Sequence, residues 1–182
     1  YVSLLGTNDA PVMHAASADA DHAAVTEDAV KDTASGTLTY TDVDQETAGS
    51  VAAVHTWAVD PATAGTYGTL SVDQNGQWTY PLDNSRAATQ GLAPGQPAQD
   101  VFRVSVTVGH GATDTHEVTI DIAGTRDVPL ITGDTSGRAR EDAVYEAQGH
   151  LTLTDPDHTG SPLELVGSGV GRYGTFTLDA AT

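Results

Sequence analysis

Apolar and polar residues alternate along much of this chain, with a period of two residues and little sign of helical periodicity. In residues 101–108 the even-numbered residues are Phe or Val, and Arg103, Ser105 and Thr107 lie between them. Residues 78–82 and 118–122 repeat the pattern. Such alternation predicts β-strands that bury one face. Further strands are expected near residues 24–25 and at 37–40, 54–59 and 70–72, which makes about seven in all.

Turn-forming residues separate these segments. Asp73-Gln74-Asn75-Gly76 has the composition of a hairpin turn, and Gly109-His110-Gly111 marks a second turn. Residues 84–99 are too many for a hairpin and too polar for a strand, so we expect a crossover between two sheets there, with one helical turn at 85–89. The pattern as a whole predicts an all-β chain that folds as an immunoglobulin-like β-sandwich.

Four phrases of the chain occur twice, in the same order. Residues 6–12 return as 124–130, 27–30 as 141–144, 39–44 as 152–157, and 66–73 as 172–179. Collinear repetition over a domain-sized distance predicts tandem modules. We therefore expect residues 1–9 to be the last strand and linker of a preceding repeat, 10–124 to be a complete repeat, and 125–182 to be the N-terminal part of the next.

The second copy is predicted to be truncated. It stops just after its counterpart of Asp73, so it lacks counterparts of the segments around Trp78, Phe102 and Ile120. A sandwich without those strands leaves one inner face uncovered. We therefore do not expect residues 125–182 to form a self-sufficient domain.

The composition narrows the range of partners. The chain has 182 residues, with 25 acidic against 7 basic side chains and a net charge of −18. This charge repels nucleic acid and anionic lipid headgroups, and it suits the binding of cations or solubility in salt. No apolar run approaches the roughly 20 residues that span a bilayer. Cysteine is absent, so neither disulfides nor thiolate metal sites are available.

Catalytic patterns are missing from the sequence, and we predict that the chain is not an enzyme. No Gly-x-Ser-x-Gly phrase supplies a nucleophile, and the seven histidines are scattered without the spacing of a zinc site. The glycine-rich run at residues 167–171 precedes a predicted strand and opens no helix, so we interpret it as a loop and not as a phosphate cradle.

Acidic phrases recur at the spacing of the repeats. Calcium prefers six to eight oxygen ligands, and carboxylates from separate loops supply them well. In an Asp-x-Asp segment with extended backbone, both carboxylates project from one side. We expect the linker, the Glu-Asp pair and the Asp-x-Asp segment of each copy to lie near a module end and to converge on calcium at a junction. The candidate ligands are Asn8, Asp9, Glu27, Asp28, Asp42, Asp44, Asp127, Glu141, Asp142, Asp155 and Asp157.

Two alternatives to calcium binding stay open. For any single acidic pair, Asp and Asn favour turns because their side chains bond to nearby backbone. The overall acidity also suits a saline habitat without any specific ion. Arg126 stands where the first copy has Asn8, so the junction at residues 124–157 is expected to bind calcium more weakly, or Arg126 pairs with a carboxylate in place of the ion.

The ordered phrases resemble those of the VCBS repeat. They include Gly-Thr-Asn-Asp-Ala-Pro-Val at residues 6–12, Thr-Glu-Asp at 26–28, Tyr-Gly-Thr-Leu at 67–70 and Gly-Gln-Trp-Thr-Tyr-Pro-Leu at 76–82. VCBS repeats occur in very large bacterial secreted and surface proteins, including RTX-type biofilm adhesins that use type I secretion. The resemblance implies a cadherin-like fold, an extracellular or cell-surface location, and calcium that stiffens the junctions between repeats.

Three functions compete at this point. The first is a structural extender or adhesion module whose immediate partners are the neighbouring repeats, while other domains meet host, biofilm-matrix or surface ligands. The second is a carbohydrate- or ligand-binding module that uses exposed aromatic residues. Trp78 and Tyr80 alternate into the predicted core, so Trp57 is the residue that would favour this function if it lay exposed beside a groove. The third is an accessory domain of a secreted enzyme.

Overall fold

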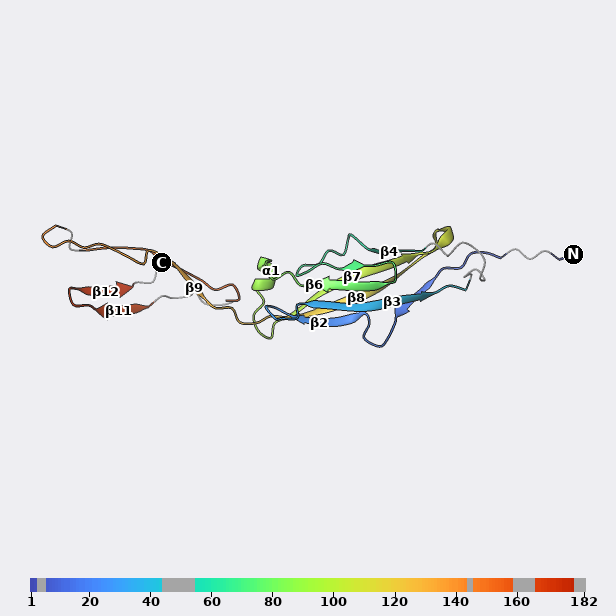
Figure 1. The fold of residues 1–182 in the computed structure, drawn as a ribbon, viewed down its shortest axis with the longest axis horizontal. Helices are drawn as coiled ribbons and strands as arrows, with labels where there is room; N and C mark the ends of the chain where they lie inside the picture. The colour runs from blue at the N-terminus through green and yellow to red at the C-terminus, as the bar shows by residue number, and fades with distance from the viewer. Residues whose placement is uncertain (3–5, 44–54, 144–145, 159–165, 179–182) are drawn as a thin grey trace. The chain divides into compact units, whose positions relative to one another are not determined.

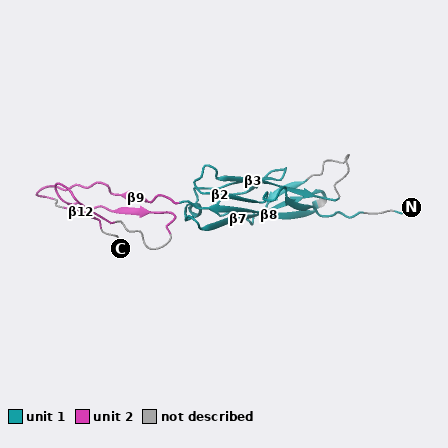
Figure 2. Cartoon of the chain, turned by 90° about the horizontal axis from the view of Figure 1, so that it is seen from below, with its two compact units in different colours: residues 1–125 teal, residues 126–182 magenta. Residues whose placement is uncertain are grey.

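A computed structural model of the chain describes residues 1–2, 6–43, 55–143, 146–158 and 166–178. It divides into two compact units, residues 1–125 and 126–182, which are coloured separately in Figure 2. The described residues form strands with almost no helix, which confirms the predicted all-β fold class.

The first unit is a sandwich of two four-stranded sheets, shown in Figure 1. The sheet called sheet 1 has the order β1 (Val12–Ala15), β3 (Thr33–Thr41), β6 (Gln77–Pro81) and β5 (Ser71–Val72). The sheet called sheet 2 has the order β2 (His22–Thr26), β8 (Thr113–Ala123), β7 (Pro97–Thr107) and β4 (Thr56–Val59). The segment before β3 therefore contributes one edge strand to each sheet.

One of these edge strands was not predicted, and the other pairs in an unexpected direction. β1 pairs with β3 in antiparallel register, with Val12 opposite Thr41. β2 pairs with β8 in parallel, so that Thr26 lies opposite Ala123. As a result β2 runs toward the end of the unit where β8 finishes, and β3 runs back toward the end where the unit begins.

The core lies between the sheets and includes most of the residues predicted from the alternation, together with residues such as Met13 and Leu92 that were not predicted. Trp78 and Tyr80 from β6 are fully buried, as are Val104 and Val106 from β7 and Ile120 from β8. Burial of one such side chain contributes about 1.5–3 kcal/mol. A short strand buries fewer side chains than a long one. The alternation of apolar and polar residues therefore predicts the long strands best.

The predicted turns and the crossover are confirmed. Gly76 has a φ of +74°, and the Asp73 carboxylate accepts the backbone N–H of Asn75 at 2.8 Å and of Gln77 at 2.9 Å. Residues 109–111 form a single 3-10 turn between β7 and β8. Between β6 and β7 the chain crosses from sheet 1 to sheet 2 and makes the short helix α1 (Ala87–Gln90).

The second unit contains two separate strand pairs in its described part. β9 (Leu130–Gly133) pairs with β10 (Leu151–Thr154), and β11 (Gly167–Val170) pairs with β12 (Thr175–Leu178). The prediction of a loop at residues 167–171 was therefore wrong, because antiparallel backbone pairing with β12 makes residues 167–170 a strand. Phe176 is 58% exposed, whereas its counterpart Leu70 in the first unit packs against the core.

The strand predicted within residues 1–9 stays a prediction. Residues 3–5 lie outside the described part of the chain, and residues 1–2 and 6–9 are not in a strand. No helix in the described part of the chain is long and apolar enough to cross a membrane.

Candidate functional site

Glu27 is a buried carboxylate at the end where the first unit finishes. It follows β2, its backbone N–H donates to the carbonyl of Ala123 at 2.9 Å, and its side chain is fully buried. The carboxylate accepts the backbone N–H of Thr125 at 3.0 Å and the side-chain amide of Gln90 at 3.3 Å. A candidate calcium ligand thus holds the first residue after the Gly124 that closes the module.

Asp28 adopts a left-handed backbone conformation, with a φ of +52°. Its backbone N–H donates to Oδ1 of Asn84 at 3.3 Å. The counterpart in the second copy, Asp142, has a φ of +59°. Positive φ is uncommon outside glycine, although Asp and Asn adopt it more readily than other residues. The two copies of the Glu-Asp phrase therefore share a local backbone conformation as well as a sequence.

The acidic phrases of the first copy do not converge on one place, and this corrects the prediction. Asp42 follows the last residue of β3, Thr41, which lies opposite Val12 near the start of the unit. Glu27 and Asp28 lie at the other end, beside Ala123 and Asn84. The nine residues of β3 span about 30 Å. The parallel direction of β2 is the reason, because it carries the Glu-Asp pair away from the linker that precedes the module.

Asn8 and Asp9 are further predicted ligands near the start of the first unit. The side-chain amide of Asn8 donates to the backbone carbonyl of Asp9 at 3.0 Å, which is a local bond of the kind that turn residues make. Asp44 lies outside the described residues. Asn8, Asp9 and Asp42 therefore stay predicted ligands of a site at this end.

In the second unit the structure brings the linker residue and the Asp-x-Asp segment together. The backbone N–H of Asp127 donates to Oδ2 of Asp157 at 3.2 Å. A side-chain hydrogen bond between Asp155 and Asp157 raises the pKa of Asp155 and lowers that of Asp157, and the charge of Arg126 lowers the pKa of Asp157 further. Oδ1 of Asp155 is buried without a hydrogen-bond partner among the described residues.

Other predicted ligands of the second copy are not part of this contact set. Glu141 and Asp142 lie exposed in a turn that follows Arg140. Across the described residues, no group of three or more His, Asp or Glu side chains is arranged to hold a metal ion. Asp127, Asp155 and Asp157 thus share hydrogen bonds without forming a ready-made coordination shell.

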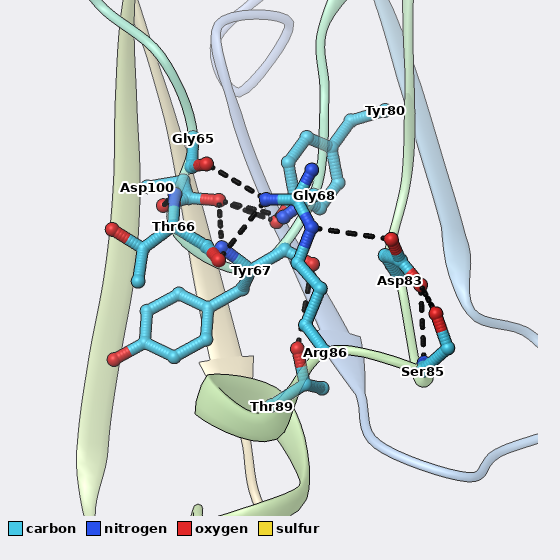
Figure 3. A network of polar contacts seen from close by, with 10 residues as sticks. All are labelled: Gly65, Thr66, Tyr67, Gly68, Tyr80, Asp83, Ser85, Arg86, Thr89 and Asp100. Atoms are coloured by element: carbon cyan, nitrogen blue, oxygen red, sulfur yellow. Dashed lines mark hydrogen bonds and ion pairs between the residues drawn. The ribbon is translucent and has the colours of Figure 1, made fainter.

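A buried polar network that the sequence analysis missed lies at the crossover (Figure 3). Asp100 on β7 is only 3% exposed. Its carboxylate accepts the backbone N–H groups of Thr66, Tyr67 and Gly68 at 2.7, 3.0 and 3.1 Å, and the hydroxyl of Tyr80 at 2.7 Å. Burial and the bond to Asp100 raise the pKa of Tyr80 well above its usual range, so Tyr80 stays a neutral donor.

Arg86 ties the same loop to the crossover. Its Nη1 donates to the backbone carbonyls of Gly65 at 2.8 Å and Thr66 at 3.0 Å, and its Nε donates to Asp83 at 3.1 Å. Hydrogen bonds from Ser85, together with Arg86, lower the pKa of Asp83. The donors and acceptors of this network satisfy one another, so its role is to hold the loop and the crossover in place.

Trp57 does not lie open beside a groove. It is half-buried on β4, packs against the core and makes an edge-to-face contact with Tyr40 at a centroid distance of 6.0 Å. The prediction that Trp78 and Tyr80 belong to the core is confirmed, since both are fully buried. Packing in the sandwich therefore accounts for the placement of all three aromatic residues.

Two histidines make hydrogen bonds to carboxylates that the sequence did not reveal. His22 on β2 lies 2.8 Å from Asp121 on β8, and His116 lies 2.7 Å from Asp21. Asp121 also accepts the side-chain amide of Gln99 at 2.6 Å, and both of its partners lower its pKa. These pairs fasten the edge strand β2 and the turn before it to β8.

Comparison with known proteins agrees with the cadherin-like architecture. Residues 8–124 match the family described as bacterial cadherin-like domain, and the chain belongs to that family. The chain is also 32% identical over 126 residues to a calcium-binding lectin, RapA2, of Rhizobium johnstonii. That alignment covers 62% of this chain and 52% of the relative, so the chain spans about half the length of the curated relative it matches.

Proposed function

We propose that this cadherin-like chain is an extracellular spacer and adhesion module of a larger bacterial surface protein, and that calcium bound by its acidic phrases stiffens it. Membership of the bacterial cadherin-like family and the similarity to a calcium-binding lectin support an adhesive role. The finer resemblance to VCBS repeats of RTX-type biofilm adhesins, with type I secretion, is part of the proposal.

The observation that carries the calcium proposal is the contact between carboxylates and the linker backbone. In the first unit Glu27 accepts the N–H of Thr125, and in the second unit Asp157 accepts the N–H of Asp127. Each unit therefore places a carboxylate on the backbone of a linker residue of its own, and in the second unit Asp155 and Asp157 lie side by side and repel one another when both are ionised. A divalent cation cancels that repulsion and recruits backbone carbonyls as further oxygen ligands.

The chemistry that calcium would supply is electrostatic and structural. Glu27 would contribute a buried carboxylate in the first unit, and Asp155 and Asp157 would contribute the oxygens of two hydrogen-bonded carboxyl groups in the second unit. Arg126 adds a positive charge next to Asp127 and lowers the pKa of Asp157, which weakens the attraction for a cation at that phrase. We expect the affinity there to be lower than at a junction whose linker carries Asn at this position.

Small-angle X-ray scattering of the full chain tests the stiffening. Calcium, compared with EDTA at matched ionic strength, should narrow the distribution of particle dimensions, and magnesium should have a much smaller effect. The variant Asp155→Asn/Asp157→Asn should scatter alike in both conditions. Identical profiles of the unaltered chain with and without calcium would refute the stiffening.

Carbohydrate binding is a second candidate, favoured by the lectin to which this chain is similar. The half-buried Trp57 offers little open ring surface, so the aromatic platform expected of that function is reduced. Binding of the chain to immobilised polysaccharides, with and without calcium, tests this function. Retention that depends on calcium would support a lectin role beside the spacer role.

A further inference from the structure

The outward face of sheet 1 differs in charge from the rest of this acidic chain. Side chains point away from the core at every second position of β1, β3, β6 and β5, as the alternating burial shows. We call this surface the neutral face; its residues are Val12, His14, Thr33, Ser35, Thr37, Thr39, Thr41, Ser71, Gln77, Thr79 and Pro81. Within these four strands, which the structure describes completely, none of the outward residues is Asp, Glu, Lys or Arg.

The outward face of sheet 2 carries charges by comparison. Arg103 on β7 lies 3.7 Å from Glu117 on β8, and His22 pairs with Asp121. A chain with a net charge of −18 would be expected to place acids on both faces if solubility alone governed its surface. On sheet 1 the acids stand at strand ends instead, and Asp73 in the turn after β5 is an example.

Hydroxyl groups dominate the neutral face and make it complementary to itself. Seven of its eleven residues are Ser or Thr, and each hydroxyl both donates and accepts hydrogen bonds. Two copies related by a twofold axis bring the same patch into contact with itself, so a surface needs matching donors and acceptors to pair in this way. Acidic surfaces of two such chains repel each other, whereas the neutral faces do not.

We propose that the neutral face is a contact surface for a second copy of this chain. The four strands hold 20 residues in all, which at about 3.3 Å rise and 4.8 Å spacing give the face an area on the order of 300 Å². A stable complex buries about 800 Å² on each partner. The contact between single modules is therefore weak and reversible, and it gains strength when several modules of neighbouring arrays pair at once. This self-association is independent of calcium, so its test does not depend on the proposed function.

Sedimentation velocity of the full chain, in EDTA and at 0.5 M salt to screen the net charge, tests the proposal. The average sedimentation coefficient should rise with protein concentration as dimers form. Thr39→Glu places a carboxylate on the exposed centre of the neutral face, and in a symmetric pair two such carboxylates meet. We expect it to weaken dimerisation at least tenfold.

The matched control is Thr115→Glu, which adds the same charge at an exposed position of β8 in the other sheet. It should dimerise like the unaltered chain, and circular dichroism should show that both variants keep the native fold. A chain that stays monomeric up to millimolar concentration would overturn the proposal. Equal weakening by the two variants would overturn it as well, because it would show that net charge and not the neutral face controls association.

Discussion

The carboxylate of Asp100 accepts the hydroxyl hydrogen of Tyr80 at 2.7 Å, and the two residues come from different sheets of the sandwich. Asp100 lies on β7 of sheet 2, and Tyr80 lies on β6 of sheet 1. The same carboxylate accepts three consecutive backbone N–H groups, from Thr66 to Gly68. One buried side chain thus joins both sheets to the loop that follows β4.

Removing parts of this network should lower stability in steps. Tyr80→Phe leaves Asp100 with three backbone donors, and we expect a loss of about 1.5–3 kcal/mol for one hydrogen bond to a charged group. Asp100→Ala leaves those donors unsatisfied in the core, and we expect a loss of about 3 kcal/mol or more. Urea unfolding measures both. Tyr40→Phe is the control for the loss of a tyrosine hydroxyl. An equal loss of unfolding free energy in Tyr40→Phe and Tyr80→Phe would contradict a stabilising role of the bond from Tyr80 to Asp100.

Glu27 should protect the linker residue Thr125 from hydrogen exchange. Its carboxylate accepts the Thr125 N–H at 3.0 Å, so Glu27→Ala should speed exchange of that amide at least tenfold. Mass-spectrometric or NMR exchange measurements report the rate. Glu117→Ala, which removes an exposed carboxylate that pairs with Arg103, is the control and should leave Thr125 unchanged. An unaltered Thr125 rate in Glu27→Ala would show that the contact does not hold the linker.

Because the backbone of Asp28 is left-handed, we expect glycine to be less destabilising than alanine at this position. Alanine at a φ of +52° costs about 1–2 kcal/mol in steric strain, whereas glycine adopts this conformation freely. Asp28→Gly should therefore be more stable than Asp28→Ala in urea unfolding. At Asp19, whose φ is not positive, the order should reverse because glycine loses more backbone entropy on folding. The same order at both positions would contradict the strain argument.

Acidification should destabilise the first unit through Asp121. Hydrogen bonds from Gln99 and His22 lower its folded-state pKa below the ordinary value of 3.8, so the unfolded state takes up the proton first. The stabilisation is present above that value and disappears as the pH falls through the lowered pKa. As the pH is lowered from 7 to 2.5, the midpoint temperature of thermal unfolding should fall less steeply for Asp121→Asn than for the unaltered chain. Parallel curves would contradict the contribution of this residue.

The strands whose sequences alternate over five or more residues could be predicted, because one face of each is buried against the other sheet. β1 could not, since Val12–Ala15 has a single buried residue, Met13, and depends on distant pairing with β3. Asp100 stands between Ala98 and Phe102 at the alternate positions of β7 that face the core. This spacing alone could have predicted a buried carboxylate. A charged residue at an inward position suggests a satisfied network rather than a break in the strand.

The acidic phrases stay predicted calcium ligands, and their positions in the fold could be predicted only in part. The recurrence of the acidic phrases correctly brought Asp127 and Asp157 together, because linker and Asp-x-Asp segment are neighbours at the start of a module. The Glu-Asp phrase was assigned to the wrong end of its own module. Its position depends on whether β2 pairs in parallel or antiparallel with β8, and local sequence does not specify that choice.

Calcium-dependent stability of the full chain tests the central claim most directly. Thermal unfolding should be followed in EDTA and in millimolar calcium at matched ionic strength, with magnesium as the control cation. A ligand at 100 times its dissociation constant stabilises the folded state by about 2.7 kcal/mol. We predict a calcium-specific rise in Tm, which Asp155→Asn/Asp157→Asn reduces. Equal Tm values in EDTA, calcium and magnesium would contradict calcium binding and leave the acidic phrases without a cation to hold.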